Sequence, residues 1–404
     1  MSSAVRQRQG PLLVSGAIAL LLGIGLGRYA FTPLIPSLVQ AGWFSAEQTA
    51  ELGAINLLGY LVGAATAHLM VRRLGPRAVI GGALAALTLS LLSCALPGGM
   101  IWYGPWRLIA GWAAATLTIV VTPIVMGRMP AARRPAASAI VFTGMGVGTI
   151  TASLLVPLLA EAGIATTWIA VGVLGGVLAG WSWRAVWRHL PAGSAATNTQ
   201  DGGSEPATPE PASWPVVTLI IVAYGLNSAG YVPHSLYWVD YIARELGRGL
   251  AVGNACWLAL GVGGLLGPAL GGYAAARLGF RAALIVAFLA MTAATALPLA
   301  SSSLAALGVS SFMVGAMVPA IITLTAGTVV EIAPADRRQQ IWGWATLSFA
   351  VAQTLGGFGM SALYASADSY RATIALGALL LCLGAGCVIT AAVLGRQRTS
   401  PATR

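Results

Sequence analysis

The chain has 404 residues, of which 57% are hydrophobic and only 8% are charged. An ordinary soluble domain carries about 25% charged residues, so a soluble fold of this size would lack polar side chains for its surface. The net charge is +11 and every basic residue is an arginine. These arginines lie in short segments between apolar runs, which argues against a nucleic-acid-binding protein. The composition therefore predicts an all-α protein of the lipid bilayer.

Twelve apolar segments are each long enough to cross a bilayer as a helix, since one crossing takes about 20 residues. Strands of a membrane barrel would be about 10 residues long with alternating polarity, and these segments are longer and apolar all round. The first follows Arg6 and Arg8, as in a signal peptide, but its length, its Arg28 and the absence of a small-residue cleavage site predict a retained helix. The predicted spans are residues 12–38, 48–71, 78–97, 101–127, 136–160, 165–187, 214–239, 250–275, 282–300, 303–330, 340–363 and 372–395.

The arginines are divided unevenly between the two sets of loops. Seventeen fall on the side that includes both termini, whereas only Arg244, Arg248 and Arg371 fall on the other. Loops rich in Arg stay in the cytoplasm, so both termini are predicted to be cytoplasmic. An even number of helices agrees with this topology, and we expect a multi-pass protein of the bacterial inner membrane.

The chain divides into two halves that repeat each other. Residues 189–213 are rich in Pro, Gly, Ser and Thr, which predicts a disordered cytoplasmic linker between domains at 1–188 and 214–404. The loop Arg73-Leu-Gly75-Pro-Arg77 returns 204 positions later as Arg277-Leu-Gly279-Phe-Arg281. The predicted fold is therefore a twelve-helix membrane protein of two pseudo-symmetric six-helix bundles, with a solute path between them.

These features resemble the major facilitator superfamily over the whole chain. Arg107-Leu-Ile-Ala-Gly111 is similar to the family's helix-4 motif Arg-x-x-x-Gly, and Gly25-Leu-Gly-Arg28-Tyr29 resembles the first helix of its YbfB/YjiJ-like branch. In the family's Arg/Gly-rich loops, Ala276 and Arg72 stand where the family has Asp. The resemblance implies the major facilitator fold, alternating access by rocking of the two bundles, and a transporter rather than an enzyme. The residues assigned to its conformational loops are Arg73, Gly75, Arg77, Arg277, Gly279 and Arg281.

Arg28 is the most informative single residue, because it is predicted to lie deep in the bilayer. A buried Arg costs at least about 2.5–3.5 kcal/mol unless it finds water or a partner. Three interpretations stay open: a cation that binds a substrate anion, an internal ion pair with Glu51, or a side chain that reaches outward to the headgroups. Arg107 on the predicted fourth helix has two: a second substrate-binding or proton-relay cation, or a donor to carbonyl groups of neighbouring helices.

The remaining candidates are polar groups on predicted spans. Glu51 and Asp240 are the candidate proton-coupling acids, although each also fits a solvated acid at a helix end. His68 and His234 could relay protons, but satisfied structural histidines are the preferred interpretation. The further candidate substrate-binding residues are Tyr29, Thr32, Asn56, Tyr60, Asn227 and Tyr231.

The predicted function is a secondary active transporter for a small organic anion. The sequence contains neither a Walker motif, a zinc triad nor a serine nucleophile elbow, so no ATP-driven transport, enzyme activity, metal or cofactor is expected. The expected partners are a small-molecule solute, the bilayer and protons, with no nucleic acid and a monomeric state. Two alternatives remain: an efflux pump for amphipathic drugs or metabolites, and a receptor or scaffold without transport.

Overall fold

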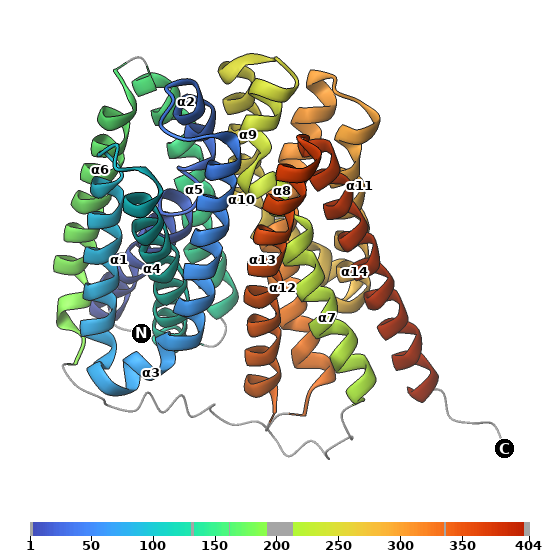
Figure 1. Cartoon of the computed structure of the whole chain (residues 1–404). Coiled ribbons are helices and arrows are strands. Elements are labelled where there is room, and N and C mark those ends of the chain that lie inside the picture. The colour runs from blue at the N-terminus through green and yellow to red at the C-terminus, as the bar shows by residue number, and fades with distance from the viewer. Residues whose placement is uncertain (1–2, 131–132, 161, 192–212, 335–336, 400–404) are drawn as a thin grey trace.

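A computed structural model describes residues 3–130, 133–160, 162–191, 213–334 and 337–399, and these residues form helices and no strands. Most of the predicted linker, residues 192–212, lies outside the described residues. We call residues 3–191 the N-terminal half and residues 213–399 the C-terminal half. Figure 1 shows the two halves side by side, with α1 beginning and α14 ending at the same end of the molecule. We call this the terminal end and the opposite one the distal end.

Each half is a bundle of long helices with several short pieces. The N-terminal half comprises α1 (Ser3–Leu20), η1 (Leu21–Leu26), η2 (Thr32–Leu34), α2 (Ile35–Gln40), α3 (Ala46–Ser93), α4 (Gly99–Gly127), α5 (Arg134–Ala160), α6 (Ile164–Ala185) and η4 (Trp187–His189). The C-terminal half comprises α7 (Trp214–Gly230), α8 (Val232–Leu236), α9 (Trp238–Asp240), η5 (Tyr241–Glu245), α10 (Gly249–Leu278), α11 (Phe280–Ala300), α12 (Leu304–Ile332), α13 (Arg338–Ala367) and α14 (Tyr370–Thr399).

Among the described residues, ten helices are long and apolar enough to cross a membrane. One of them, α3, has 48 residues, which would extend about 72 Å if straight, more than twice the hydrocarbon thickness. It contains two of the predicted spans, and Gly75 separates them with φ 80° and ψ 157°. The helix α13 coincides with the predicted span 340–363. The helices are thus consistent with the twelve predicted spans.

The internal repeat is visible in the backbone. Gly279, which lies 204 positions after Gly75, has φ 79° and ψ 159° at the junction of α10 and α11. Positive φ at low cost requires glycine, so the same tight turn recurs in each half. Gly75 and Gly279 therefore form equivalent tight turns at the terminal end, and their conformational role stays a prediction.

The same offset relates the closest helix contacts. A Cβ atom built on Gly111 of α4 would lie 1.9 Å from the carbonyl oxygen of Asn56 on α3. At Gly315 of α12 it would lie 2.0 Å from the carbonyl oxygen of Leu260 on α10. Membrane helices pack through small residues because lipid supplies no hydrophobic drive between them. Two helix pairs thus approach each other by one mechanism in both halves.

The first and seventh predicted spans were each expected to be a single helix, but both are interrupted. The first passes from α1 into a π-helical turn, η1, and then into turns across residues 27–31 before η2. The seventh is divided into α7, α8, α9 and the π-helical η5. Pro33 and Pro233 occupy equivalent places, and each lacks the N–H that a continuous helix would use. Gly25, Gly27 and Pro33 allow a bend near Arg28, and the structure shows a full interruption there.

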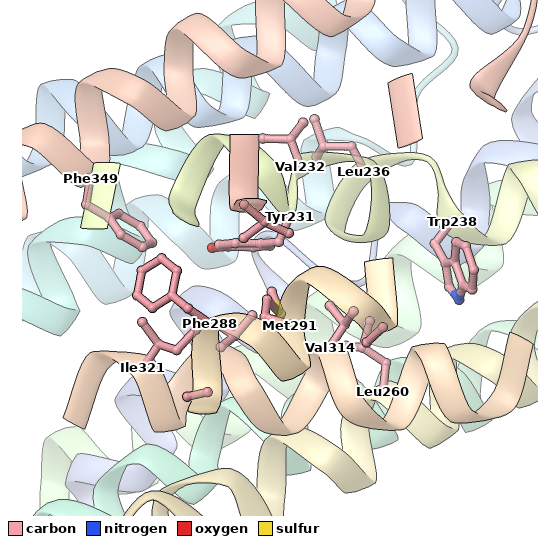
Figure 2. Close-up of a cluster of buried hydrophobic side chains, with 14 of the residues drawn as sticks. Tyr231, Val232, Leu236, Trp238, Leu260, Phe288, Met291, Val314, Ile321 and Phe349 are labelled. Atoms are coloured by element: carbon pink, nitrogen blue, oxygen red, sulfur yellow. The ribbon is translucent and has the colours of Figure 1, made fainter. Parts of the chain in front are cut away.

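The apolar core of the C-terminal half extends across the boundary between the halves. Figure 2 shows part of it, with Tyr231 near Phe349, Phe288 and Met291. Tyr29 and Met145 of the N-terminal half belong to the same buried cluster. In Figure 1 the ribbons of the halves lie closer together toward the distal end than toward the terminal end.

Candidate functional site

Arg28 lies in the interruption of the first span and reaches across to the C-terminal half. Its side chain is 4% exposed. One terminal nitrogen donates to Gln353 Oε1 at 2.9 Å, and the other donates to Ser235 Oγ at 3.4 Å. The guanidinium also lies over the rings of Tyr29 and Tyr231, 5.3 and 5.9 Å from their centroids. A buried cation is thus held by neutral groups from both halves.

The pairing of Arg28 with Glu51, one of the three interpretations above, is wrong. Glu51 is exposed near the start of α3, and no ion pair among the described residues includes Arg28. Outward snorkelling is wrong as well, because the guanidinium is buried between the halves. Among the described residues the Nε–H of Arg28 has no hydrogen-bond partner, which leaves this donor unused at the boundary.

Two more hydrogen bonds join the halves in the described part of the chain. Thr32 donates to the carbonyl oxygen of Ser235 at 2.7 Å, and Thr354 donates to the carbonyl oxygen of Leu57 at 3.1 Å. Thr32 and Ser235 lie in the distal part of their spans, and Leu57, Thr354 and Gln353 lie near the middle of theirs. These bonds close the distal side of the boundary between the bundles.

Arg107 is buried as deeply as Arg28, but within the N-terminal half. It is 1% exposed, donates to the carbonyl oxygen of Gly27 at 3.0 Å and lies 4.3 Å from the ring centroid of Phe31. A bond to a carbonyl of a neighbouring helix is what the structural interpretation expected. Its Nε and Nη2 groups have no partner, so its charge is unneutralised among the described residues. Arg107 steadies the interruption that carries Arg28.

The other predicted site residues take different positions. Thr32 and Tyr231 contact the boundary, since Gln353 Nε2 donates to the Tyr231 hydroxyl at 2.7 Å. Asn56 instead donates to the carbonyl oxygen of Arg107 at 2.9 Å, inside the N-terminal half. Asn227 is fully buried and neither amide atom has a partner. Tyr60 lies close enough to Arg28 to interact with it electrostatically.

A narrow cavity lies beside Arg28, between the two halves. It has room for only a water molecule or two. Tyr29 and Thr149 line it from the N-terminal half, and Tyr231, His234 and Ser235 from the C-terminal half. Because Ser235 also contacts Arg28, the polar edge of this otherwise largely apolar cavity adjoins the cation.

The two predicted proton-coupling acids lie away from this cavity. Glu51 is exposed, whereas Asp240 is fully buried in α9 near the distal end. Asp240 accepts two hydrogen bonds from Arg244 and one from the Tyr370 hydroxyl at 2.5 Å. The hydrogen bonds that Arg244 donates to Asp240 raise the pKa of its guanidinium above the usual range. Glu245 accepts from the backbone N–H of Tyr370 at 2.6 Å, so these acids tie the seventh span to the start of α14.

The conformational-loop arginines contact only their own half in the described structure. Arg77 lies over the ring of Trp183 and Arg277 over that of Tyr273. Arg281 lies 3.5 Å from Glu331 at the end of α12. Ala276 stands where the family's loop has Asp, so Arg281 finds its acidic partner in Glu331 of a neighbouring helix instead.

Sequence reasoning missed the two residues that bind Arg28. Gln353 could have been found, because it is a glutamine in the middle of an apolar span, where an unpaired amide is costly. Ser235 gave no such signal, since serine satisfies itself on its own helix, as the 3.0 Å bond to the carbonyl oxygen of Val232 shows.

Comparison with known proteins decides the family. The profile of the family described as "Uncharacterised MFS-type transporter YbfB" matches residues 20–389. The chain belongs to this family. It is accordingly a multi-pass membrane transporter of the major facilitator superfamily rather than an enzyme, which confirms the expected class.

A solved structure, the crystal structure of a mutant of the nucleoside transporter NupG, shares the fold with a TM-score of 0.69. The match covers 96% of this chain and 100% of NupG at 13% identity. This YbfB-family chain and NupG therefore share the major facilitator fold. No curated protein matches the chain.

Proposed function

We propose that this transporter moves a small organic anion by alternating access, and that Arg28 binds the anionic group between the halves. The observation that carries the proposal is a permanently charged side chain at the boundary with only neutral partners. Burying a cation without a counterion is costly. A solute carboxylate would supply the missing charge, and charge-assisted bonds to Arg are short and strong.

Gln353 is the group that the solute would displace. Its amide oxygen accepts from Arg28 at 2.9 Å, which is the kind of bond a carboxylate oxygen would make. Its amide nitrogen is bound to the Tyr231 hydroxyl, so exchange would free two polar groups of the C-terminal half for the solute. Because the same bonds close the distal side, solute binding and closure of that side compete for one cation.

In alternating access the solute path opens first to one side of the membrane and then to the other, and the expected topology assigns these two openings. With the arginine-rich terminal end in the cytoplasm, the closed distal side faces the periplasm. Opening toward the distal side would require Arg28 to release Gln353 and Ser235, and Thr32 to release Ser235.

The test is a binding screen on the purified protein in detergent. Benzoate, lactate and succinate are compared with benzamide and uridine by thermal shift, followed by calorimetry for any that bind. We expect carboxylates to bind and their neutral counterparts not to. Arg28→Gln should weaken binding about tenfold to over a hundredfold, the effect of losing a charge-assisted contact of about 1.5–3 kcal/mol. Arg28→Lys should restore part of it, because Lys lacks the planar fork.

The matched control is Arg371→Gln, an exposed arginine at the distal end that donates to the carbonyl oxygen of Leu299. This variant should bind as the wild type does. Equal binding of benzoate and benzamide, or unchanged binding by Arg28→Gln, would reject the anion site.

A further inference from the structure

His234 is a buried imidazole in the cavity beside Arg28, and its two nitrogens are in different surroundings. The side chain lies on α8 and is fully buried. Its Nε2 atom lies 2.9 Å from Ser310 Oγ, and its Nδ1 atom has no hydrogen-bond partner. The ring stacks on Trp238, with centroids 4.1 Å apart.

The bonds of Ser310 assign the tautomer of this histidine. The Ser310 hydroxyl donates its one proton to the carbonyl oxygen of Ala294 at 2.7 Å. Its oxygen can then only accept from His234, so the imidazole proton resides on Nε2. Among the described residues Nδ1 has no partner for its lone pair, and it is sealed from water in this closed state.

We propose that His234 Nδ1 is the proton-binding site that couples this transporter to protons, an inference that rests on the proposed transport at Arg28. Once the boundary opens to water, a proton would bind Nδ1, while Nε2–H keeps its bond to Ser310. The Trp238 face would stabilise the resulting imidazolium, as aromatic faces stabilise cations. Neither Glu51 nor Asp240 lines the cavity, whereas His234 does.

The surrounding charges link the proton to the solute. The titratable or charged groups around His234 are Arg28, which shares Ser235 with the cavity, Tyr29 and Tyr231 in its wall, and Cys256 near Ser311. Arg28 is the one permanent charge of this set, and it repels a second cation. An anion bound to Arg28 removes that repulsion, so solute and proton would each increase the affinity for the other.

The proton should also shift the conformational equilibrium in the absence of solute. In the closed state His234 is fully buried, no acidic side chain lines its cavity, and bulk water cannot reach it. The neutral imidazole is therefore favoured in that state. In a state whose boundary is open to water, the imidazole can bind a proton between pH 8 and pH 5. Lowering the pH must therefore favour the open state. The open-to-closed ratio can change by at most about tenfold per pH unit for one proton.

The experiment measures this ratio from the distance between two spin labels across the distal side, by double electron–electron resonance with no solute added. Labels are placed at Ala41 and Ser366, which are exposed in opposite halves, after Cys382 and Cys387 are replaced by serine. We expect the open fraction to rise as the pH falls, and this rise to disappear in His234→Gln, whose amide can keep the Ser310 bond. His68→Gln, at an exposed histidine, is the matched control and should keep the full rise.

An unchanged pH response in His234→Gln would overturn the proposal and assign the response to the distal acids. Absence of a response in the wild type would overturn it as well. A second measurement needs no variant at His234: ¹⁵N-histidine spectra of the wild type, assigned with His68→Gln and His189→Gln. One buried histidine should show a protonated Nε2 and a bare Nδ1 at pH 7.5, and a protonated Nδ1 there would overturn the proposal. Since no solute is used, these outcomes are independent of whether Arg28 binds an anion.

Discussion

The helices α4 and α12 occupy equivalent places in the two halves, yet they carry opposite polar chemistry. Gly111 and Gly315, 204 positions apart, let each helix touch the backbone of its neighbour. Four positions earlier, α4 has Arg107 and α12 has Ser311. Arg107 leaves two N–H groups without a partner, whereas Ser311 accepts from Trp238 Nε1 at 2.8 Å and donates to the carbonyl oxygen of Leu307 at 2.7 Å.

The comparison separates the residues that build the bundle from those that give it a function. Glycines in contact with backbone fix the distance between helices in both halves by the same steric rule. The polar residue beside them is free to differ, because the packing does not depend on it. The N-terminal half thus supplies uncompensated positive charge, and the C-terminal half supplies neutral donors and acceptors such as Gln353 and His234.

The largest expected effect tests the shared packing. Gly111→Ala and Gly315→Ala each place a methyl group about 2 Å from a carbonyl oxygen, and backbone on both sides cannot yield cheaply. We expect each to destabilise the protein by about 3 kcal/mol or more, the upper range for overpacking, measured by thermal unfolding in detergent. Gly308→Ala, also on α12 but with no atom within 4 Å, is the control and should be neutral or slightly stabilising. A tolerated Gly315→Ala beside a disrupted Gly111→Ala would break the equivalence of the halves.

The next effect concerns an ion pair present in one half only. Asp240 is bound to Arg244 and Tyr370 in the C-terminal half, whereas the N-terminal position 200 residues earlier is the exposed Gln40. Asp240→Asn weakens charge-assisted bonds in a buried site and should cost about 1.5–3 kcal/mol. Gln40→Ala, its counterpart in the other half, should change unfolding by less than about 0.5 kcal/mol. Equal effects at the two positions would show that the distal ends are held alike.

Arg107→Met sharpens the contrast between α4 and α12. It removes a buried charge with two unpartnered N–H groups while keeping apolar volume over Phe31. Replacing buried charge by apolar side chains is often neutral or stabilising, so we expect unfolding to change by about 1 kcal/mol or less. A loss above about 2 kcal/mol would mean instead that the bond to Gly27 holds the interrupted first span. Ser311→Ala, at the equivalent position, is the matched comparison and should cost about 1 kcal/mol.

The smallest effect is expected at the conformational loops. Arg281 and Glu331 form an ion pair whose side chains are 41% and 39% exposed. Exposed pairs contribute about 0–1 kcal/mol, so Glu331→Gln should lower the unfolding free energy by less than about 1 kcal/mol. Arg77, the counterpart of Arg281, packs on Trp183 instead. A larger loss in Glu331→Gln would show that the pair also holds one conformation of the transport cycle.

Much of the fold could be predicted because its signals are local. A membrane helix satisfies its own backbone hydrogen bonds, so apolar length alone located the spans, including the two within α3. The turns at Gly75 and Gly279 followed from a repeated glycine at a loop. The interruption at Arg28 was anticipated only as a bend and the one near Pro233 was not anticipated, since a proline shows where a helix is weak and not how far it opens.

The candidate site could be predicted only in part. Arg28, Thr32 and Tyr231 were expected at the boundary and lie there, while the alternative of an ion pair between Arg28 and Glu51 was wrong. Asn56 was expected to face the solute path, and its amide binds the Arg107 carbonyl instead. A rotation of about 100° per residue along a helix decides which face a side chain occupies, and no periodic pattern resolves it in helices that are apolar all round.

The sequence by itself determined what the solvent imposes. Scarce charge, apolar spans, arginine-rich loops and an offset of about 204 define a membrane protein of two repeated bundles, because each feature depends on neighbours along the chain. The tertiary structure alone decided which groups share the buried polar region. Arg28 and Gln353 are separated by 325 positions, and the free Nδ1 of His234 follows from bonds made by Ser310, 76 positions away. Such partners depend on how the bundles dock, and docking is set by the whole surface of both halves rather than by any local run of residues.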